Sequence, residues 1–235
     1  MHRHSVDAYL ETIYFLAFPI GEYRPHTTGS PTLAARVAEM LGVSRASAGE
    51  MLKRLEADGL IERGKQKEAL LTPSGRARAE RMVRKHRIVE RFLTDFLGYS
   101  PAEAHEFADD LGETFTDEMV ERITLKLGKP ERCPHGWPVE PDVEQAENAE
   151  LSPLAELEPG QRATIVRLAE HDGDLLRWFY EQGLVPGSEI ELSEASRAAG
   201  QFTVRLNGDE RGVGERAAAG LFVRPSLPPA ARAAG

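Results

Sequence analysis

The sequence has little of what a membrane or secreted protein needs. No apolar run reaches the roughly 18 residues that a membrane-spanning helix requires. The N-terminal residues run into Asp7 and Glu11 instead of the apolar core of a signal peptide. The only cysteine, Cys133, excludes an internal disulfide framework and is typical of a reducing compartment. Together these absences predict a cytoplasmic protein.

The sequence also lacks the motifs of several common enzyme classes. It contains no glycine-rich phosphate loop, no Gly-x-Ser-x-Gly nucleophile elbow and no internal repeat. The 235 residues, 41% of them hydrophobic, are nevertheless enough for two small domains with buried cores. The function therefore has to be inferred from the charge distribution and the local motifs.

The negative charge is spread unevenly along the chain. The formal net charge is −9, but residues 36–87 hold thirteen Lys and Arg against seven Asp and Glu, a local net charge of +6. Residues 91–235 hold fourteen against twenty-seven, a net charge of −13. A local basic field can attract phosphates even on an acidic protein, although a solvated basic helix is the alternative. The pattern indicates a basic module joined to an acidic remainder.

The basic module has the pattern of a winged helix. A helix over 32–41, a glycine turn and a second helix capped by Ser44 together make a helix-turn-helix. Two short apolar stretches, 59–63 and 69–72, then flank a basic hairpin tip and are expected to form strands. The order helix-turn-helix and β-hairpin predicts a domain that binds double-stranded DNA.

In such a domain the second helix enters the major groove with its N-terminal residues leading. Arginine suits guanine and glutamate suits the amino group of cytosine. The candidates for base contacts are Arg45, Ser47 and Glu50. Phosphate contacts are expected from Ser44, Lys53, Arg54, Lys65 and Lys67. The alternative for Arg45 and Glu50 is an ordinary exposed helix start.

Three apolar-striped helices are predicted next, over about 76–96, 102–115 and 117–127. Because they have no partner inside the winged helix, they suggest a dimerisation unit. The alternative is that the three helices only pack among themselves. Residues 131–148 are rich in proline and acidic residues, with little periodicity, and are predicted to be a loop that continues into an acidic linker.

Metal-ligand side chains recur in two of these helices at four-residue steps. Such steps place side chains on one helix face, and imidazole and carboxylate groups bind divalent transition metals. The residues concerned are His86, Glu90, His105, Asp109 and Glu113. Further along, Cys133 and His135 flank a proline and can chelate one ion. Each residue alone could equally belong to a solvated surface, and a short Cys-x-His motif is often accidental.

Residues 154–226 predict a small β-barrel. Short alternating stretches are separated by Pro186-Gly187 and Asn207-Gly208 turns around a helix over 174–182. The tail beyond Pro225 is rich in alanine and proline and is expected to be disordered.

The arrangement as a whole resembles the diphtheria toxin repressor family of metal-dependent transcriptional regulators. The resemblance is centred on GLIERGKQKEALLTPSGRARAERMVRKHRIVERFLTDFLG and covers nearly the whole chain up to about Pro225. The Cys-Pro-His-Gly motif is most similar to the manganese-responsive branch, and GQRATIVRL with LLRWFYEQGLVPGSEIEL resembles the SH3-like domain of the longer members.

The resemblance implies a mainly α fold with small β parts. Its expected divisions are a winged helix-turn-helix DNA-binding domain (1–75), a helical dimerisation and metal-binding domain with linker (76–150), an SH3-like (FeoA-like) domain (151–226) and a disordered tail (227–235). The implied function is that of a homodimeric repressor that binds Mn²⁺ or Fe²⁺ and then a palindromic operator, controlling genes of metal homeostasis and transport.

Carried over by position, the resemblance implies two metal sites per subunit. The first would take Glu11, His86, Asp109 and Glu113. The second would take Glu90, His105, Cys133, His135 and an acidic group at the start of the barrel helix, for which Asp172 is chosen. An oxygen-rich first site with one imidazole favours Mn²⁺ or Fe²⁺ over zinc or copper.

Two positions depart from the family pattern. Ala8 stands where relatives have Met or Asp, so that Asp7 or water would have to substitute. Gly112 and Glu113 stand where relatives have Glu-His, which exchanges a nitrogen ligand for an oxygen ligand. Two other functions remain open: a winged-helix regulator that responds to an organic ligand or a protein, and a metalloenzyme. No obvious nucleophile or free general base supports the metalloenzyme, so we expect a non-enzyme.

Overall fold

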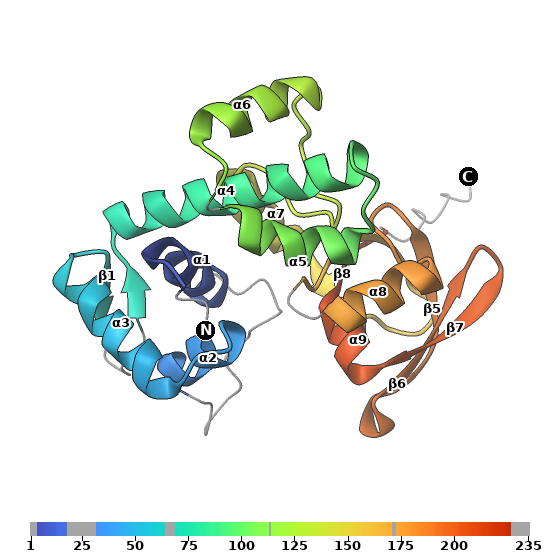
Figure 1. Ribbon diagram of the computed structural model, residues 1–235. Coiled ribbons are helices and arrows are strands. Elements are labelled where there is room, and N and C mark those ends of the chain that lie inside the picture. The colour runs from blue at the N-terminus through green and yellow to red at the C-terminus, as the bar shows by residue number, and fades with distance from the viewer. Residues whose placement is uncertain (1–3, 18–31, 64–68, 113, 171–172, 227–235) are drawn as a thin grey trace, which may run out of the picture. The chain divides into compact units, whose positions relative to one another are not determined.

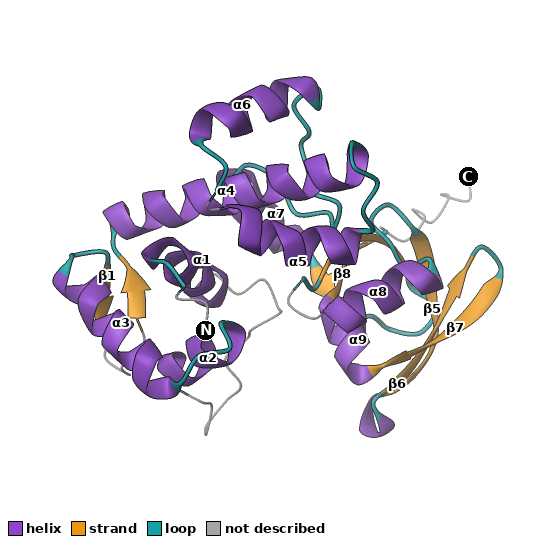
Figure 2. Ribbon diagram, in the orientation of Figure 1, coloured by secondary structure: helices purple, strands orange, loops and turns teal. Residues whose placement is uncertain are grey.

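The computed structural model describes residues 4–17, 32–63, 69–112, 114–170 and 173–226. The chain forms two compact units, one made of Met1–Cys133 and Val139–Pro141 and the other of Pro134–Pro138 and Asp142–Gly235. Helices dominate the first unit, and the second is built on a β-sheet (Figure 1, Figure 2). No helix within the described ranges is long and apolar enough to cross a membrane.

The first unit begins with a winged helix-turn-helix, as the sequence predicts. Its elements are α1 (Val6–Ala17), α2 (Leu33–Met40), α3 (Arg45–Ala57), β1 (Ile61–Arg63) and β2 (Ala69–Leu71). The Ser44 hydroxyl caps α3 by accepting a hydrogen bond from the Ser47 backbone N–H at 3.0 Å. The strands β1 and β2 pair antiparallel, with Ile61 opposite Leu71. The predicted hairpin tip lies outside the described residues.

One hydrophobic core holds the winged helix together. Leu10 and Ile13 of α1 and Leu52 and Leu55 of α3 are fully buried in it. Complete burial of one such side chain contributes about 1.5–3 kcal/mol. Burial also raises the pKa of the Tyr9 hydroxyl above its ordinary value of 10.0. Helix α1 therefore contributes side chains to the same hydrophobic core that fixes the position of α3.

The long helix α4 (Pro73–Asp95) starts three residues earlier than the sequence predicts. Thr72 caps it by accepting a hydrogen bond from the Gly75 N–H at 3.1 Å. Pro73 occupies the first helical turn, where a backbone N–H has no partner within the helix, so that its missing N–H costs no hydrogen bond. The earlier start arises because a Thr-Pro pair can begin a helix as readily as it can form a turn. A Cβ on Gly75 would lie 1.9 Å from the Leu60 carbonyl oxygen, so this close approach requires glycine.

Two further helices, α5 (Pro101–Gly112) and α6 (Asp117–Lys126), pack against α4 (Figure 1). Val89 and Leu93 of α4 pack with the small residues Ala104 and Ala108 of α5. The helices thus pack against one another, as the alternative to a dimerisation unit has it, but this packing leaves some apolar side chains exposed. Large side chains in the connection between α4 and α5 and on α5 itself stay exposed: Phe96, Leu97, Tyr99 and Phe107.

The second unit is a six-stranded antiparallel sheet with short helices. Its strands are β3 (Ser152–Pro153), β4 (Arg162–Leu168), β5 (Glu189–Ser196), β6 (Gln201–Leu206), β7 (Asp209–Gly214) and β8 (Leu221–Pro225). They lie in the order β3-β8-β4-β5-β6-β7. Its helices include α8 (Gly173–Gln182), α9 (Glu215–Gly220) and the short 3₁₀ turns η1 (Asn148–Glu150), η2 (Leu154–Glu156) and η3 (Arg197–Ala199).

Strand β7 was not expected from the sequence, because its glycines and charges are poor strand formers. The turn before it was expected, and Asn207 and Gly208 have the positive φ angles (53° and 93°) that a two-residue hairpin loop needs. This turn pairs β7 with β6 over six residue pairs. The hairpin geometry thus overrides the weak local preference.

The prediction of a loop that continues into an acidic linker over 131–148 was wrong for its second half. Residues Pro141–Glu147 form helix α7. Its Glu147 accepts a hydrogen bond at 3.0 Å from Arg167 of β4, a guanidinium that is completely buried. The segment 134–138 is also fixed in the second unit, since Trp137 donates its indole N–H to the Leu168 carbonyl at 2.8 Å. Acidic residues here balance a buried charge, which local sequence alone does not reveal.

Candidate metal centre and nucleic-acid interface

Three buried metal-ligand side chains meet where α4 and α5 pack together. His86 and Glu90 lie one turn apart on α4, and His105 faces them from α5. The His86 Nε2 atom is 2.9 Å from Glu90 Oε1 and 3.2 Å from His105 Nδ1. The His105 Nδ1 atom is 2.7 Å from the same Glu90 oxygen. Two imidazole nitrogens and a carboxylate oxygen therefore form a triangle with sides of 2.7–3.2 Å.

This triangle fits a divalent cation. Adjacent ligands around an octahedral ion lie about 3.0 Å apart when each metal–ligand bond is about 2.1 Å. Both imidazole nitrogens also point at one carboxylate oxygen while lying 3.2 Å from each other, so two N–H groups directed there would oppose one another. A cation would replace these protons and accept all three lone pairs. We call His86, Glu90 and His105 the α4–α5 cluster.

The other nitrogen of His86 faces the winged helix. Its Nδ1 atom lies 3.7 Å from Oε1 of Glu11, a mostly buried residue of α1. The sequence assigned His86 to one ligand set and placed Glu90 and His105 in another. The structure instead brings His86 Nε2 to Glu90 and His105 and leaves only its Nδ1 atom toward Glu11. Four-residue spacing does not determine which ring nitrogen faces which helix.

Not all of the predicted first site can be located. The side chain of Asp109 and the whole of Glu113 lie outside the described residues, so their role stays a prediction. Asp7, the suggested substitute for a ligand at Ala8, forms an ion pair with Arg78 of α4. At Gly112 an added Cβ would meet no atom within 4 Å, so the helix has room for a side chain there.

The second unit contributes a different buried pair. His135 Nδ1 lies 3.4 Å from Glu170 Oε1, and both residues are buried. The sequence resemblance pointed to Asp172, which lies outside the described residues, and not to Glu170. A usable signal was present, because Glu170 lies only two residues beyond the end of the buried strand β4, which restricts where its side chain can lie. Cys133 is buried in the first unit, and its place among the ligands stays a prediction.

The predicted DNA-contacting face of α3 is exposed. Arg45, Ser47, Glu50 and Lys53 all point to solvent. Ser44 is exposed as well, although its hydroxyl is engaged in the helix cap. Arg54 lies 3.8 Å from Asp58 in an exposed ion pair, which competes little with a phosphate. Lys65 and Lys67 of the predicted hairpin tip lie outside the described residues.

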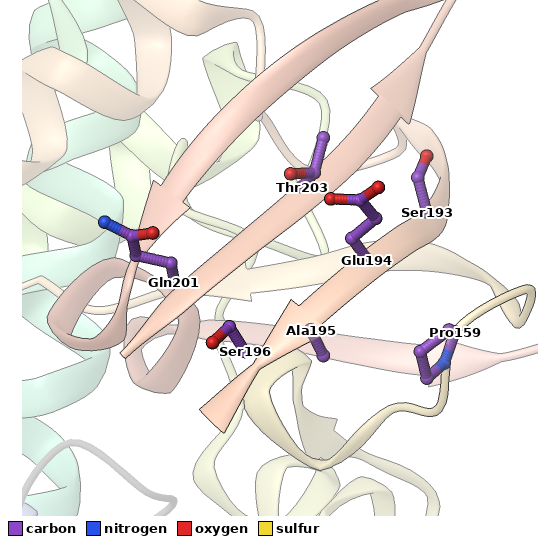
Figure 3. A pocket seen from close by; sticks show the side chains of 7 residues that line it. All are labelled: Pro159, Ser193, Glu194, Ala195, Ser196, Gln201 and Thr203. Atoms are coloured by element: carbon purple, nitrogen blue, oxygen red, sulfur yellow. The ribbon is translucent and has the colours of Figure 1, made fainter. Parts of the chain in front are cut away.

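Two surface hollows of about 430 Å³ each are lined by residues that differ from those of the α4–α5 cluster. The one on the second unit lies along β5 and β6 (Figure 3) and is lined by Pro159, Ser193, Glu194, Ala195, Ser196, Gln201 and Thr203. It has a single carboxylate and neither histidine nor cysteine, so its lining lacks a metal-ligand set. The hollow on the first unit is lined by Asp7, Arg78, Arg81, Met82, Lys85 and Asp117. Ion pairs already join Asp7 with Arg78 and Asp117 with Lys85.

Comparisons with known proteins agree with this arrangement. Residues 1–69 match the model for the N-terminal DNA binding domain of iron dependent repressors, 72–140 match that for their metal binding and dimerisation domain, and 152–225 match a FeoA domain. The iron-dependent repressor IdeR of Mycobacterium leprae is 31% identical over 219 residues, which cover 88% of this chain and 90% of that protein. The diphtheria toxin repressor of Corynebacterium glutamicum is 30% identical over 198 residues, covering 80% and 83%.

Solved structures are similar over nearly the same length. A manganese-dependent transcriptional repressor in complex with manganese is 28% identical, with a TM-score of 0.79 over 94% of this chain and 99% of that one. The repressor ScaR with bound Cd²⁺ is 27% identical, with a TM-score of 0.76 over 94% and 99%. The fold of this chain is therefore shared with these solved structures over 94% of its length.

Proposed function

Because the chain belongs to the diphtheria toxin repressor family of iron- and manganese-dependent transcriptional repressors, we propose that metal bound at the α4–α5 cluster switches on its binding to operator DNA. The observation that carries this proposal is the buried triangle of donor atoms from His86, Glu90 and His105. A divalent cation supplies there the positive charge that a buried carboxylate needs.

The donor set favours Fe²⁺ or Mn²⁺ as the effector. Two imidazoles and one carboxylate with positions left for further ligands are typical of ferrous sites, and manganese accepts the same donors with additional oxygen. We retain Asp109 and Glu113 as proposed oxygen ligands. For a second site we propose Cys133 and His135, which are close in sequence, with Glu170 in place of Asp172 as the acidic group, because Glu170 lies beside His135. Two sites per subunit remain the expectation.

The exposed apolar side chains give the dimer a defined surface. Phe96 and Leu97 directly follow α4 and are more than half exposed (57% and 55%), and Phe107 on α5 is 42% exposed. An exposed patch of large apolar side chains typically marks a protein interface. We propose that a second copy of the chain covers this patch. Twofold symmetry would then present two α3 helices to successive major grooves, about 34 Å apart.

Helix α4 connects the parts that must communicate. With 23 residues at 1.5 Å rise it spans about 35 Å. It starts beside the wing, carries His86 and Glu90 in its second half, and ends next to the exposed apolar residues Phe96 and Leu97. Residues of the cluster therefore lie on the element that joins the DNA-binding domain to the proposed dimer interface. Metal binding at the α4–α5 cluster would select the separation of the two DNA-binding domains of the dimer that suits the operator.

The proposal is tested by measuring DNA binding with and without metal. An operator would be selected from a random duplex pool in Mn²⁺, and its affinity measured by fluorescence anisotropy in EDTA, Mn²⁺, anaerobic Fe²⁺ and Zn²⁺. We expect tight binding only with Mn²⁺ or Fe²⁺ and a loss of that response in Glu90→Gln. The exposed Glu118→Gln on α6 serves as a control.

Equal affinity in EDTA and in every metal would refute the proposal and favour a regulator that responds to an organic ligand or a protein. Turnover of a substrate by the purified protein would favour a metalloenzyme, against our expectation of a non-enzyme. A repressor has to reach chromosomal DNA, and the proposed function therefore agrees with the cytoplasmic location that the sequence predicts.

A further inference from the structure

His86 presents its two ring nitrogens to two different helices. Its Nε2 atom lies in the triangle with Glu90 and His105, at 2.9 and 3.2 Å. Its Nδ1 atom lies on the other side of the ring, 3.7 Å from Glu11 of α1. The side chain of His86 is only 5% exposed and that of Glu11 14%, so water reaches little of this contact.

A neutral imidazole carries one N–H and one lone pair. A nitrogen that binds a metal uses its lone pair, and the proton then resides on the other nitrogen. If Nε2 of His86 serves as the ligand, as its position in the triangle implies, the proton lies on Nδ1 and points toward Glu11. Metal-bound histidines generally donate this N–H to a carboxylate or a carbonyl, which fixes the ring.

We propose that Glu11 is a positioning residue that accepts the Nδ1–H of His86 and is not itself a metal ligand. The inference rests on the proposed function and revises the role that the sequence resemblance gave to Glu11. At 3.7 Å the two atoms are just beyond hydrogen-bond distance, which a small torsional change in the glutamate side chain can close. The other α1 carboxylate near α4, Asp7, is held in its ion pair with Arg78.

This hydrogen bond would carry the state of the cluster into the DNA-binding domain. On α1, Glu11 follows Leu10 and lies two residues before Ile13, and both of these side chains are fully buried in the winged-helix core with Leu52 of α3. Helix α1 also packs directly against α4 (Figure 1). Fixing the His86 tautomer therefore favours one position of α1 relative to α4. Because α1 packs with α3 in the same core, this also fixes the position of α3.

The competing arrangement has Glu11 as a ligand. His86 would then bind the metal through Nδ1, and its Nε2–H would be directed at Glu90. The two arrangements differ in which ring nitrogen carries the proton and in what is required of residue 11. A positioning role needs only an oxygen that accepts a hydrogen bond, whereas a ligand to Mn²⁺ needs the charge of the carboxylate.

The test compares Glu11→Gln with Glu11→Ala in the full-length protein, with Glu80→Gln on α4 as a matched control. Mn²⁺ affinity is measured by calorimetry and operator affinity by anisotropy. For Glu11→Gln we expect Mn²⁺ affinity within about threefold of wild type, because the amide oxygen still accepts the N–H. Glu11→Ala should lose about 10–100-fold and weaken the coupling to DNA. Equal, large losses in both variants would overturn the inference.

A second measurement stands without the variants and covers the case in which Glu11→Ala folds poorly. Nitrogen-15 NMR of the diamagnetic Zn²⁺-loaded protein reports which nitrogen of His86 carries the proton, with His86 assigned by its absence from the His86→Gln spectrum. A proton on Nδ1 is expected, and a proton on Nε2 would refute the positioning role. Failure of wild-type protein to bind Mn²⁺ would instead count against the proposed function.

Discussion

Replacing Glu90 by glutamine should remove most of the stabilisation that Mn²⁺ gives the folded protein. Glu90 is fully buried and supplies the oxygen that lies closest to both imidazole nitrogens, at 2.9 and 2.7 Å. Its carboxamide replacement has nearly the same shape but no charge. The substitution therefore tests the charge of the donor and leaves the packing of α4 against α5 largely intact.

The magnitude follows from binding linkage. Mn²⁺ at one hundred times its Kd stabilises the wild-type fold by about 2.7 kcal/mol. For a chain of this size this raises Tm by about 5–11 °C. Removing even an outer partner of a metal ligand weakens binding by about 10–100-fold, so loss of a ligand should cost at least about 100-fold. At the same Mn²⁺ concentration the variant would then gain about 0.4 kcal/mol, or about 1–2 °C.

The assay is a thermal melt of the dimer in EDTA and in Mn²⁺, with calorimetry setting the metal concentration relative to the wild-type Kd. Glu118→Gln, at a side chain that is 74% exposed, should keep the full Mn²⁺ shift. An undiminished shift in Glu90→Gln would refute the assignment of the α4–α5 cluster as the metal site. A lower Tm in EDTA alone would show only a loss of packing, so the difference between the two melts is the deciding quantity.

Three further substitutions test other parts of the molecule. Arg45→Ala on the exposed start of α3 should weaken operator binding by about 1–3 kcal/mol if the arginine reads a base, with Mn²⁺ affinity unchanged in calorimetry; an unchanged operator affinity would remove Arg45 from the interface. Phe96→Asp should shift the dimer to monomer in sedimentation, and an unaltered dimer would place the interface elsewhere. Gly75→Ala should lower the free energy of unfolding by more than about 2 kcal/mol in urea melts, since its Cβ would lie 1.9 Å from the Leu60 carbonyl oxygen; a neutral effect would contradict that contact.

The winged helix could be predicted from local signals because each of its elements carries its own. Ser44 followed by a helical stripe indicates a capped helix, and the structure has the cap hydrogen bond at 3.0 Å. Helix α7 could not be predicted in the same way. Its acidic residues favour a solvated linker until Arg167, twenty residues beyond Glu147, is known to be buried beside them. Local sequence does not identify a distant counter-charge.

The metal cluster was predicted as a set of residues but not as an arrangement. Four-residue spacing correctly put His86 and Glu90 on one face of α4. The division of ligands between two sites depended instead on the rotation of the His86 ring between α1 and α5, which only tertiary packing decides. Glu170 was missed for a related reason, because its pairing with His135 joins segments thirty-five positions apart.

The cluster also explains why metal can act as a switch and not only as a stabiliser. A buried carboxylate such as Glu90 requires nearby positive charge, and its burial without that charge costs several kcal/mol. A cation that binds this arrangement of α1, α4 and α5 more tightly than other arrangements therefore raises its population. Since a ligand shifts an equilibrium by its differential affinity alone, the contact between His86 and Glu11 decides how much of that free energy reaches α1. If α1 and α4 keep the same relative position with and without metal, the cluster would stabilise the fold while leaving operator affinity unchanged.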